Sequence, residues 1–166
     1  MTQSPVFEMN REFDAPPALV WKAWTTPDLV ARWYGPGVET VIHRFEAKPG
    51  GLWLTEMRMS GGSGYQKAEF LDVEALRRLV CLQSTTDEAW RPASNPAMPD
   101  WPRVLRLEVA LEPIGENRTA LRLLWSPHEA SEAEIACFAQ AIANLGKGWG
   151  MGMDALAALL PELGAA

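Results

Sequence analysis

The sequence predicts an α+β protein in which a curved antiparallel sheet is wrapped around one long C-terminal helix. Near the C-terminus, apolar residues recur at spacings of three and four from Ile135 to Leu160, which is typical of an amphipathic helix. Upstream, short strand-like segments are joined by glycine- and proline-containing turns that favour antiparallel neighbours. Because a helix of ~40 Å is longer than a typical strand, only a whole sheet lying across it buries its apolar face.

The first expected element is a half-buried strand over residues 6–13. Phe7, Met9 and Phe13 alternate with polar residues, which is the period of a strand with one buried face. Arg11 is the polar exception on the apolar side. An inward-facing arginine needs a carboxylate partner such as Glu69 or an anionic ligand, unless its charged end reaches solvent.

Two short helices are expected to follow. The stretch DAPPALVWKAW offers Asp14 as a helix cap and prolines at the first helical positions. In the next stretch Thr26 is the expected cap, and Gly35-Pro36 ends the helix. The aromatic side chains of this region, Trp21, Trp24 and Trp33, are interpreted as core residues. Tyr34 and the Gly35-Pro36 turn are left open between core and binding site.

Six further strands are expected at residues 39–47, 52–59, 65–74, 78–85, 103–112 and 118–126, with turns that include Lys48-Pro-Gly-Gly51 and Gly61-Gly-Ser-Gly64. An antiparallel meander is the simplest topology. The exception is DEAWRPASNPAMPDWP, from Asp87 to Pro102, which is too long for a hairpin and carries Trp90 and Trp101. Such loops are lids, packed flaps or disordered insertions, and we expect this one to lie over one end of the sheet.

The long helix is expected from residue 132 to residue 160. Ser131 and Glu134 form a capping-box pattern at its start. The stretch GKGWGMG places glycines on alternate positions in its middle, at a cost of about 1 kcal/mol each relative to alanine. On a helical wheel Gly148 and Gly152 share one flank, where a ligand or the sheet can approach the backbone beside Trp149. A kink is the alternative.

Composition bounds the class of protein. The chain has 166 residues, 48% of them hydrophobic, which predicts a single domain over residues 1–166. A net charge of −6 argues against nucleic acid or an anionic membrane as partner. Cys81 and Cys137 lie far apart, so we expect two buried, reduced thiols. No signal peptide or apolar span is recognisable, which favours a cytoplasmic location.

Four features of the sequence can be taken together: the order of elements, REFDAPPALVWKAWTTPDLVARWYGP at residues 11–36, the Lys48-Pro-Gly-Gly51 turn before Trp53, and GWGMGMDALAALL at residues 148–160. With these features, the sequence resembles the SRPBCC or START-like superfamily, the polyketide cyclase and birch-pollen-allergen type. Within it, the sequence is similar to the C-terminal domain of the activator of heat-shock-protein-90 ATPase. The resemblance covers essentially the whole chain and implies a helix-grip fold, often with an apolar cavity between sheet and helix. The long loop at residues 87–102 and the four helical glycines depart from the pattern.

The implied cavity draws its lining from inward-facing strand positions and the middle of the helix. The candidate ligand-binding residues are Arg11, Trp53, Thr55, Met57, Met59, Phe70, Trp125, Phe138, Ile142 and Trp149. Most are apolar or aromatic, and adaptable methionines are common in small-molecule sites. The alternative is that these side chains fill the space completely.

Three functions follow as hypotheses. The first is a binding protein for a small apolar molecule, and the second, implied by the resemblance alone, is a regulator of the chaperone's ATPase in the stress response. The third is a cyclase-like or hydrolytic enzyme that uses the same cavity. His43 and His128 have no partners at metal-ligand spacing, no GxSxG serine is present, and neither cysteine has a neighbouring histidine, so no metal, cofactor or catalytic residue is predicted. The oligomeric state stays open, a dimer included.

Overall fold

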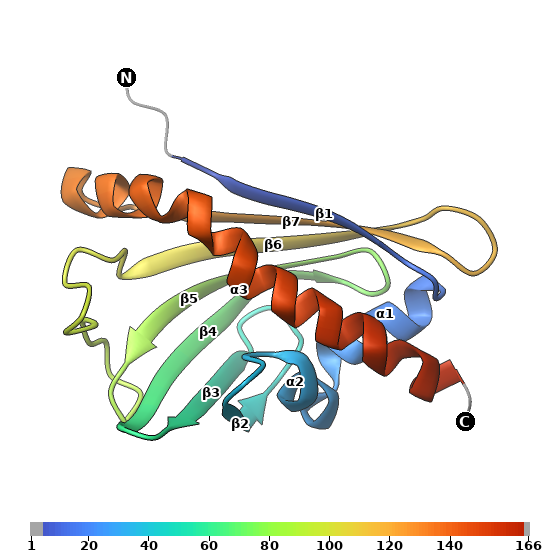
Figure 1. The fold of residues 1–166 in the computed structure, drawn as a ribbon, viewed down its shortest axis with the longest axis horizontal. Helices are drawn as coiled ribbons and strands as arrows, with labels where there is room; N and C mark the ends of the chain where they lie inside the picture. The colour runs from blue at the N-terminus through green and yellow to red at the C-terminus, as the bar shows by residue number, and fades with distance from the viewer. Residues whose placement is uncertain (1–4, 165–166) are drawn as a thin grey trace.

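The structure, a computed structural model, describes residues 5–164 and contains a curved seven-stranded sheet that lies against one long helix (Figure 1). The strands are β1 (Phe7–Phe13), β2 (Glu39–Phe45), β3 (Leu52–Met59), β4 (Gly62–Glu74), β5 (Arg78–Thr86), β6 (Val104–Pro113) and β7 (Thr119–Pro127). The helices are α1 (Pro17–Thr25), α2 (Pro27–Trp33) and α3 (Glu132–Gly164). The α+β class, the two short helices and the long C-terminal helix are confirmed.

The sheet is an antiparallel meander, as predicted. Its order is β1-β7-β6-β5-β4-β3-β2, so that β2 to β7 follow chain order and β1 pairs with β7. Because β1 and β2 form opposite edges, the sheet curves without closing into a barrel. Short connections allow this arrangement, since neighbouring antiparallel strands need only a tight turn.

The two short helices begin at prolines, as expected, but the cap of α1 differs from the prediction. The N-cap of α1 is Pro16, and the carboxylate of Asp14 instead accepts a hydrogen bond of 3.1 Å from Arg118 Nε. Asp14 is therefore not the cap, because it lies two residues before the N-cap position. Thr26 is the N-cap of α2, although its side chain makes no capping hydrogen bond.

The β3–β4 hairpin is tighter than the glycine-rich sequence suggested. Met59 pairs with Gly62, so the turn consists of Ser60 and Gly61 alone. Gly62 has a φ of +129°, a backbone conformation that glycine adopts readily. The predicted turn at residues 61–64 is thus too long, and its last three residues belong to β4.

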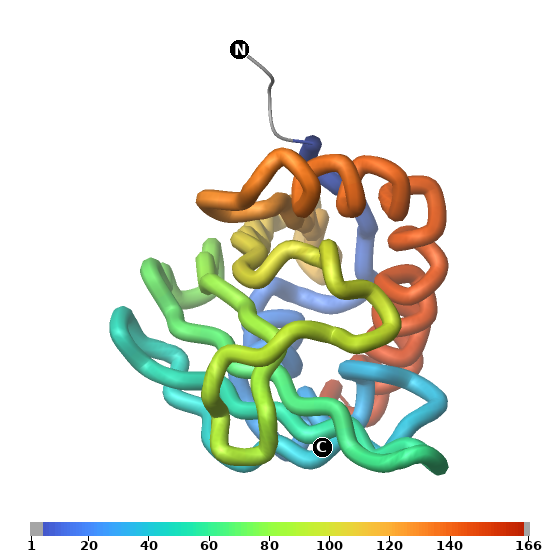
Figure 2. Tube along the Cα trace, turned by 90° about the vertical axis from the view of Figure 1, so that its left-hand side faces the viewer, coloured from blue at the N-terminus to red at the C-terminus, as the bar shows by residue number. Residues whose placement is uncertain are grey.

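Helix α3 begins with the predicted capping box. Glu134 N donates to Ser131 Oγ at 3.2 Å, and Ser131 N donates to Glu134 Oε1 at 3.1 Å. The helix continues through the glycines and includes Pro161, so it extends four residues beyond the predicted end at residue 160. Figures 1 and 2 show its axis changing direction near the middle. The glycine-rich segment stays helical, and the chain bends without breaking the helix.

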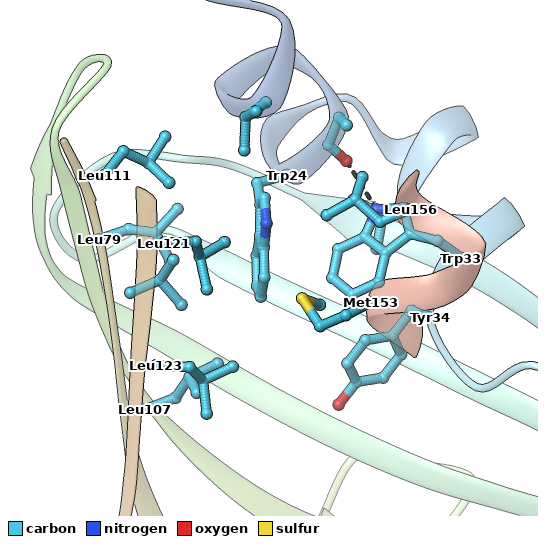
Figure 3. Close-up of a cluster of buried hydrophobic side chains, with 14 of the residues drawn as sticks. Trp24, Trp33, Tyr34, Leu79, Leu107, Leu111, Leu121, Leu123, Met153 and Leu156 are labelled. Atoms are coloured by element: carbon cyan, nitrogen blue, oxygen red, sulfur yellow. Dashed lines mark hydrogen bonds between the residues drawn. The ribbon is translucent and has the colours of Figure 1, made fainter. Parts of the chain in front are cut away.

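The core lies between the sheet and the C-terminal part of α3. Figure 3 shows leucines of β5, β6 and β7 facing Trp24, Met153 and Leu156. The side chains of Trp24, Met153 and Leu156 are at most 1% exposed. The indole Nε1 of Trp33 donates to the carbonyl oxygen of Ala23 at 2.9 Å, which ties α2 to α1. Trp24 and Trp33 are therefore core residues as predicted, whereas Trp21 is only partly buried.

The segment at residues 87–102 is ordered around two side-chain turns. Asp87 Oδ1 accepts hydrogen bonds from the backbone N–H groups of Ala89 and Arg91, and Asn95 Oδ1 accepts one from Ala97. Trp90 packs on Tyr65 and His43, on the convex face of the sheet. Trp101 packs on Trp125 and Phe138, on the concave face. The loop, which crosses the end of the sheet (Figure 2), thus packs one tryptophan against each of the two faces.

Both cysteines are free thiols. Cys81 is fully buried in β5, and burial raises the pKa of its thiol to about 12. Cys137 is only partly buried on α3, so the expectation of two buried thiols holds for Cys81 alone.

Candidate functional site

A pocket of about 360 Å³ opens beside the middle of α3. It is bounded by the turn between α2 and β2, by the inward face of β4 and by the end of β7. The lining residues are Trp33, Tyr34, Gly35, Pro36, Gln66, Trp125, Asn144, Leu145, Gly148, Trp149, Met151 and Gly152. The pocket lies at one side of the grip between sheet and helix, whereas the centre of the grip is filled with side chains.

Aromatic rings make up the deep part of the pocket. The ring centroid of Trp149 lies 5.6 Å from that of Trp125 and 6.2 Å from that of Tyr34, both edge to face. Trp33 packs edge-on against Tyr34 at 5.7 Å. Edge-to-face contacts hold such rings in fixed orientations, so the walls are preformed.

The polar groups of the pocket are held in a directional hydrogen-bond network. The Tyr34 hydroxyl donates to Gln66 Oε1 at 2.6 Å, and Trp125 Nε1 donates to Gln83 Oε1 at 2.9 Å. While its carbonyl oxygen accepts from Tyr34, Gln66 keeps its amide NH₂ as a donor in the pocket lining. Gln83 is 1% exposed behind the lining, and its Nε2 also has no hydrogen-bond partner among the described residues.

The electrostatic character of the pocket is neutral. Within residues 5–164, the lining contains no carboxylate, guanidinium, ammonium or imidazole group. Tyr34 is its one titratable side chain, and burial, with a smaller contribution from the neighbouring Cys81, raises the pKa of the hydroxyl far above its usual value. The phenol therefore stays protonated and serves as a hydrogen-bonding group.

Glycines allow the backbone to form parts of the wall. Gly35 has a φ of +69°, and an added Cβ would lie 3.1 Å from the Met57 methyl carbon and 3.0 Å from Thr40 Oγ1. A side chain at Gly152 would meet Trp33 at 3.5 Å, whereas nothing lies within 4 Å of a Cβ at Gly148. Gly148 and Gly152 share the pocket flank of the helix, as the helical wheel predicted.

A second pocket of about 380 Å³ lies between the third and fourth turns of α3 and the 87–102 segment. Its lining residues are Thr85, Asn95, Met98, Trp101, Ala141, Asn144 and Leu145. Asn144 and Leu145 line both pockets, so the two lie next to each other along one edge of the helix.

The structure separates the predicted site residues into groups. Trp125 and Trp149 line the first pocket. Trp53, Thr55, Phe70 and Phe138 are at most 2% exposed, and they fill the core. Met57 lies behind Gly35, and Ile142 packs against the core from α3. Met59 is 52% exposed at the end of β3, away from the lining.

Arg11 points inward from β1, as the alternation predicted, but it lies outside the pocket lining. Its Nη2 is 2.7 Å from Asp154 Oδ1 on α3, and its guanidinium lies 5.8 Å from the ring centroid of Phe13. The predicted carboxylate partner therefore exists, but it is Asp154 of the helix. Glu69, the suggested partner, is exposed on the convex side of β4.

Sequence reasoning missed Gln66 and Asn144 as lining residues. Gln66 could have been found, because it is two residues before Ala68 and four before Phe70, whose side chains face the core. Asn144 carries no comparable signal, since its place at the rim depends on how α3 bends over the sheet. Tyr34, left open from the sequence, forms part of the pocket wall.

A separate polar cluster lies on the convex face of β3 and β4. His43 Nε2 is 2.8 Å from Glu56 Oε1, and the Ser63 hydroxyl donates to Glu56 Oε2 at 2.6 Å. These hydrogen bonds, with a smaller contribution from Arg58, lower the pKa of Glu56 to about 2. The serine donates to a carboxylate and not to the imidazole, so this is not the arrangement of an activated nucleophile. Within residues 5–164 no cluster of metal-ligating side chains occurs.

None of the helices in the described part of the chain is both long and apolar enough to cross a membrane.

The fold is shared with several solved structures. A protein from Arthrobacter aurescens is 26% identical with a TM-score of 0.79, and the match covers 96% of this chain and 87% of that one. A Nitrosomonas europaea protein is 23% identical over 100% of both chains, with a TM-score of 0.72. A Mycobacterium smegmatis protein is 18% identical, with a TM-score of 0.77 and coverage of 95% and 91%.

No curated protein matches the sequence. The neighbouring structures have the SRPBCC-type helix-grip architecture, in agreement with the resemblance seen in the sequence. The family model described as Activator of Hsp90 ATPase homolog 1-like protein matches residues 14–161, which include every element from α1 to most of α3. With six of the seven strands, both short helices and most of the gripped helix inside that match, the chain belongs to the Activator of Hsp90 ATPase homolog 1-like family.

Proposed function

We propose that the protein binds a small, neutral, largely apolar molecule in the pocket beside α3. The observation that carries the proposal is a preformed wall of aromatic rings, Tyr34, Trp125 and Trp149, with a glycine edge and no charged side chain in the described lining. Its volume of about 360 Å³ lies at the lower end of the range for small-molecule sites. Family membership supports a ligand-binding role of this kind.

The neutrality of the ligand follows from desolvation. Moving an ionised group into a pocket without a countercharge costs several kcal/mol. A ligand that carried a charge at its buried end would meet only Gln66, Asn144 and the Tyr34 hydroxyl. Neutral molecules avoid this cost and gain from contact with the indole rings.

The free donor of Gln66 favours a ligand with an acceptor oxygen at its buried end. The carbonyl oxygens of Gln66 and Gln83 are already occupied by Tyr34 and Trp125. A carbonyl or ether oxygen on the ligand would satisfy the remaining amide NH₂ of Gln66.

The experiment is a titration with butyrophenone, a neutral phenyl ketone, followed by quenching of tryptophan fluorescence and by calorimetry. Gly148→Leu places a side chain at the pocket edge and is expected to weaken binding at least tenfold. Gly150→Leu is the matched control, because Gly150 is outside the lining and its Cβ would meet nothing within 4 Å. Equal affinities of wild type and Gly148→Leu, or no binding to wild type, would contradict the proposal. Native mass spectrometry after incubation with a lipid and metabolite extract would then identify the natural ligand class.

A second candidate function is regulation of the chaperone ATPase named in the family description. What favours it is the match over residues 14–161 alone. Adding the protein to the chaperone from the same organism and measuring ATP hydrolysis tests it. An unchanged ATPase rate at saturating protein would remove this candidate.

An enzymatic function has less support from the geometry. General acid–base catalysis needs a titratable group within reach of the substrate. In the described lining the one titratable side chain is Tyr34, whose pKa is raised by burial. We therefore place binding ahead of catalysis.

A further inference from the structure

We infer that the two pockets form one elongated site with two compartments, and that its ligand has a ring-shaped polar end and an aliphatic tail. The ring end lies in the aromatic compartment beside Trp149, and the tail extends along α3 beneath the 87–102 segment. The inference rests on the proposed function, and it adds a second binding compartment together with the shape of the molecule that fills it.

The first argument is continuity along the helix. Ala141, Asn144 and Leu145 line the second compartment, and Asn144, Leu145, Gly148 and Gly152 line the first. These positions advance by three or four residues, so they form one stripe on α3. At 1.5 Å per residue, the stripe from Ala141 to Gly152 extends roughly 16 Å, much longer than a single ring system.

The second argument is continuity of the aromatic wall. Trp101 of the second compartment lies 5.9 Å from Trp125 of the first, and Trp125 lies 5.6 Å from Trp149. The three indoles form an unbroken row that passes from one compartment to the other. A molecule in contact with Trp149 can therefore continue toward Trp101 without leaving an apolar surface.

The third argument is that the loop forms a defined wall. Met98 N donates to Asn95 O at 3.0 Å, and Trp101 N donates to Met98 O at 3.0 Å. These turns fix Met98, which is 39% exposed although it is apolar and lines the compartment. At the other end of the loop, Trp90 packs against Tyr65 on the convex face with ring centroids 5.5 Å apart. The loop is therefore held at both ends while the Met98 side chain lines the second compartment.

The two compartments differ in chemistry. The first is built from aromatic rings and the donor of Gln66, which suits a planar ring with an acceptor oxygen. The second combines the aliphatic side chains of Met98, Ala141 and Leu145 with the indole of Trp101 and the uncharged polar side chains of Thr85, Asn95 and Asn144, and its described lining has no charged side chain. An aliphatic chain fits there, because it needs no hydrogen-bond partner and gains from every buried methylene.

The test uses straight-chain alkyl phenyl ketones from acetophenone to octanophenone, which keep the ring and the carbonyl while the tail grows. Affinity for the wild-type protein is expected to rise about fourfold per added methylene until the tail fills the second compartment. Met98→Trp fills that compartment and is expected to stop the rise at a short tail while leaving the affinity for acetophenone unchanged. Ala141→Leu fills it from the helix side and gives the same result if Met98→Trp fails to fold.

The matched control is Met59→Trp, because Met59 is exposed and outside both linings. It is expected to retain the full rise with tail length. Binding of acetophenone and butyrophenone with no rise for longer ketones would overturn the inference and leave the proposed function standing. A rise of equal extent in Met98→Trp and Ala141→Leu would overturn it as well. Binding of no ketone to the wild-type protein would contradict the proposed function and the inference together.

Discussion

The two parts of α3 meet the same sheet in different ways. Between residues 152 and 164 the helix buries Gly152, Met153, Leu156, Leu159 and Leu160. Between residues 132 and 151, Phe138 alone is buried, and the helix borders both pockets. The C-terminal part therefore packs into the core, whereas the rest of the helix borders the two pockets.

The difference arises from side-chain volume on both partners. The C-terminal part places leucines and a methionine against Trp24, Trp33 and the leucines of β5 to β7 (Figure 3). The other part places the polar Asn144 and the small Gly148 at the edge of the first pocket. The helix axis bends in this part (Figure 2). Close packing of the C-terminal part fixes the position of the helix, so the pockets beside its other part stay open.

The largest expected effect is from truncation in the packed part. Leu156→Ala removes a fully buried side chain and should lower the free energy of unfolding by about 2–5 kcal/mol. Leu145→Ala, in the part that borders the pockets, should cost less than half as much because Leu145 is only partly buried. Urea denaturation measures both. Equal losses would mean that the two parts of the helix contribute equally to the core.

Alanine in place of the exposed glycines should stabilise the protein. Gly148→Ala and Gly150→Ala add a Cβ that meets nothing within 4 Å, and each should raise the free energy of unfolding by up to about 1 kcal/mol. Gly152→Ala should gain a similar amount, since its Cβ would lie 3.5 Å from the Trp33 carbonyl oxygen, which is an ordinary van der Waals contact. Thermal unfolding compares the three variants. A loss of stability at Gly148 and Gly150 would show that the bend of α3 requires glycine there.

The ion pair between Arg11 and Asp154 fastens β1 to the packed part of α3. Both side chains are partly or largely exposed, at 31% and 71%, so Arg11→Ala should cost less than about 1 kcal/mol. The loss should shrink in high salt, because mobile ions screen exposed charges. A salt-independent loss would indicate that packing of Arg11 on Phe13 matters more than the ion pair.

Acid should weaken the convex side of the sheet around β3, where Glu56 lies. The pKa of Glu56 is lowered to about 2 by its hydrogen bonds to Ser63 and His43, so this group stabilises the fold above its unfolded pKa of 4.5. The contribution is lost as the pH falls from 4.5 toward 2. Glu56→Gln should flatten this part of the pH dependence, as measured by melting temperature at pH 5 and pH 3. A slope as steep as that of the wild-type protein would assign the acid sensitivity to other carboxylates.

The order and type of the elements could be predicted from the amino-acid pattern alone. Alternating apolar and polar residues predicted the strands, and the positions of prolines predicted the starts of the short helices. Apolar residues spaced by three and four, together with the Ser131–Glu134 capping box, predicted the start of α3. These signals are local, since they depend on residues within one or two turns of each other. The same reasoning correctly placed Trp24 and Trp33 in the core.

Packing between distant segments sets which inward-facing residues line a pocket and which fill the core. Trp53, Phe70 and Phe138 carry the same pattern as Trp125 and Trp149, yet the former are core residues and the latter border an open space. The choice depends on the bend of α3, the position of the α2–β2 turn and the loop at residues 87–102. Packing is non-directional and acts between residues far apart in the chain, so periodicity identifies the buried face but cannot locate the space left unfilled on it.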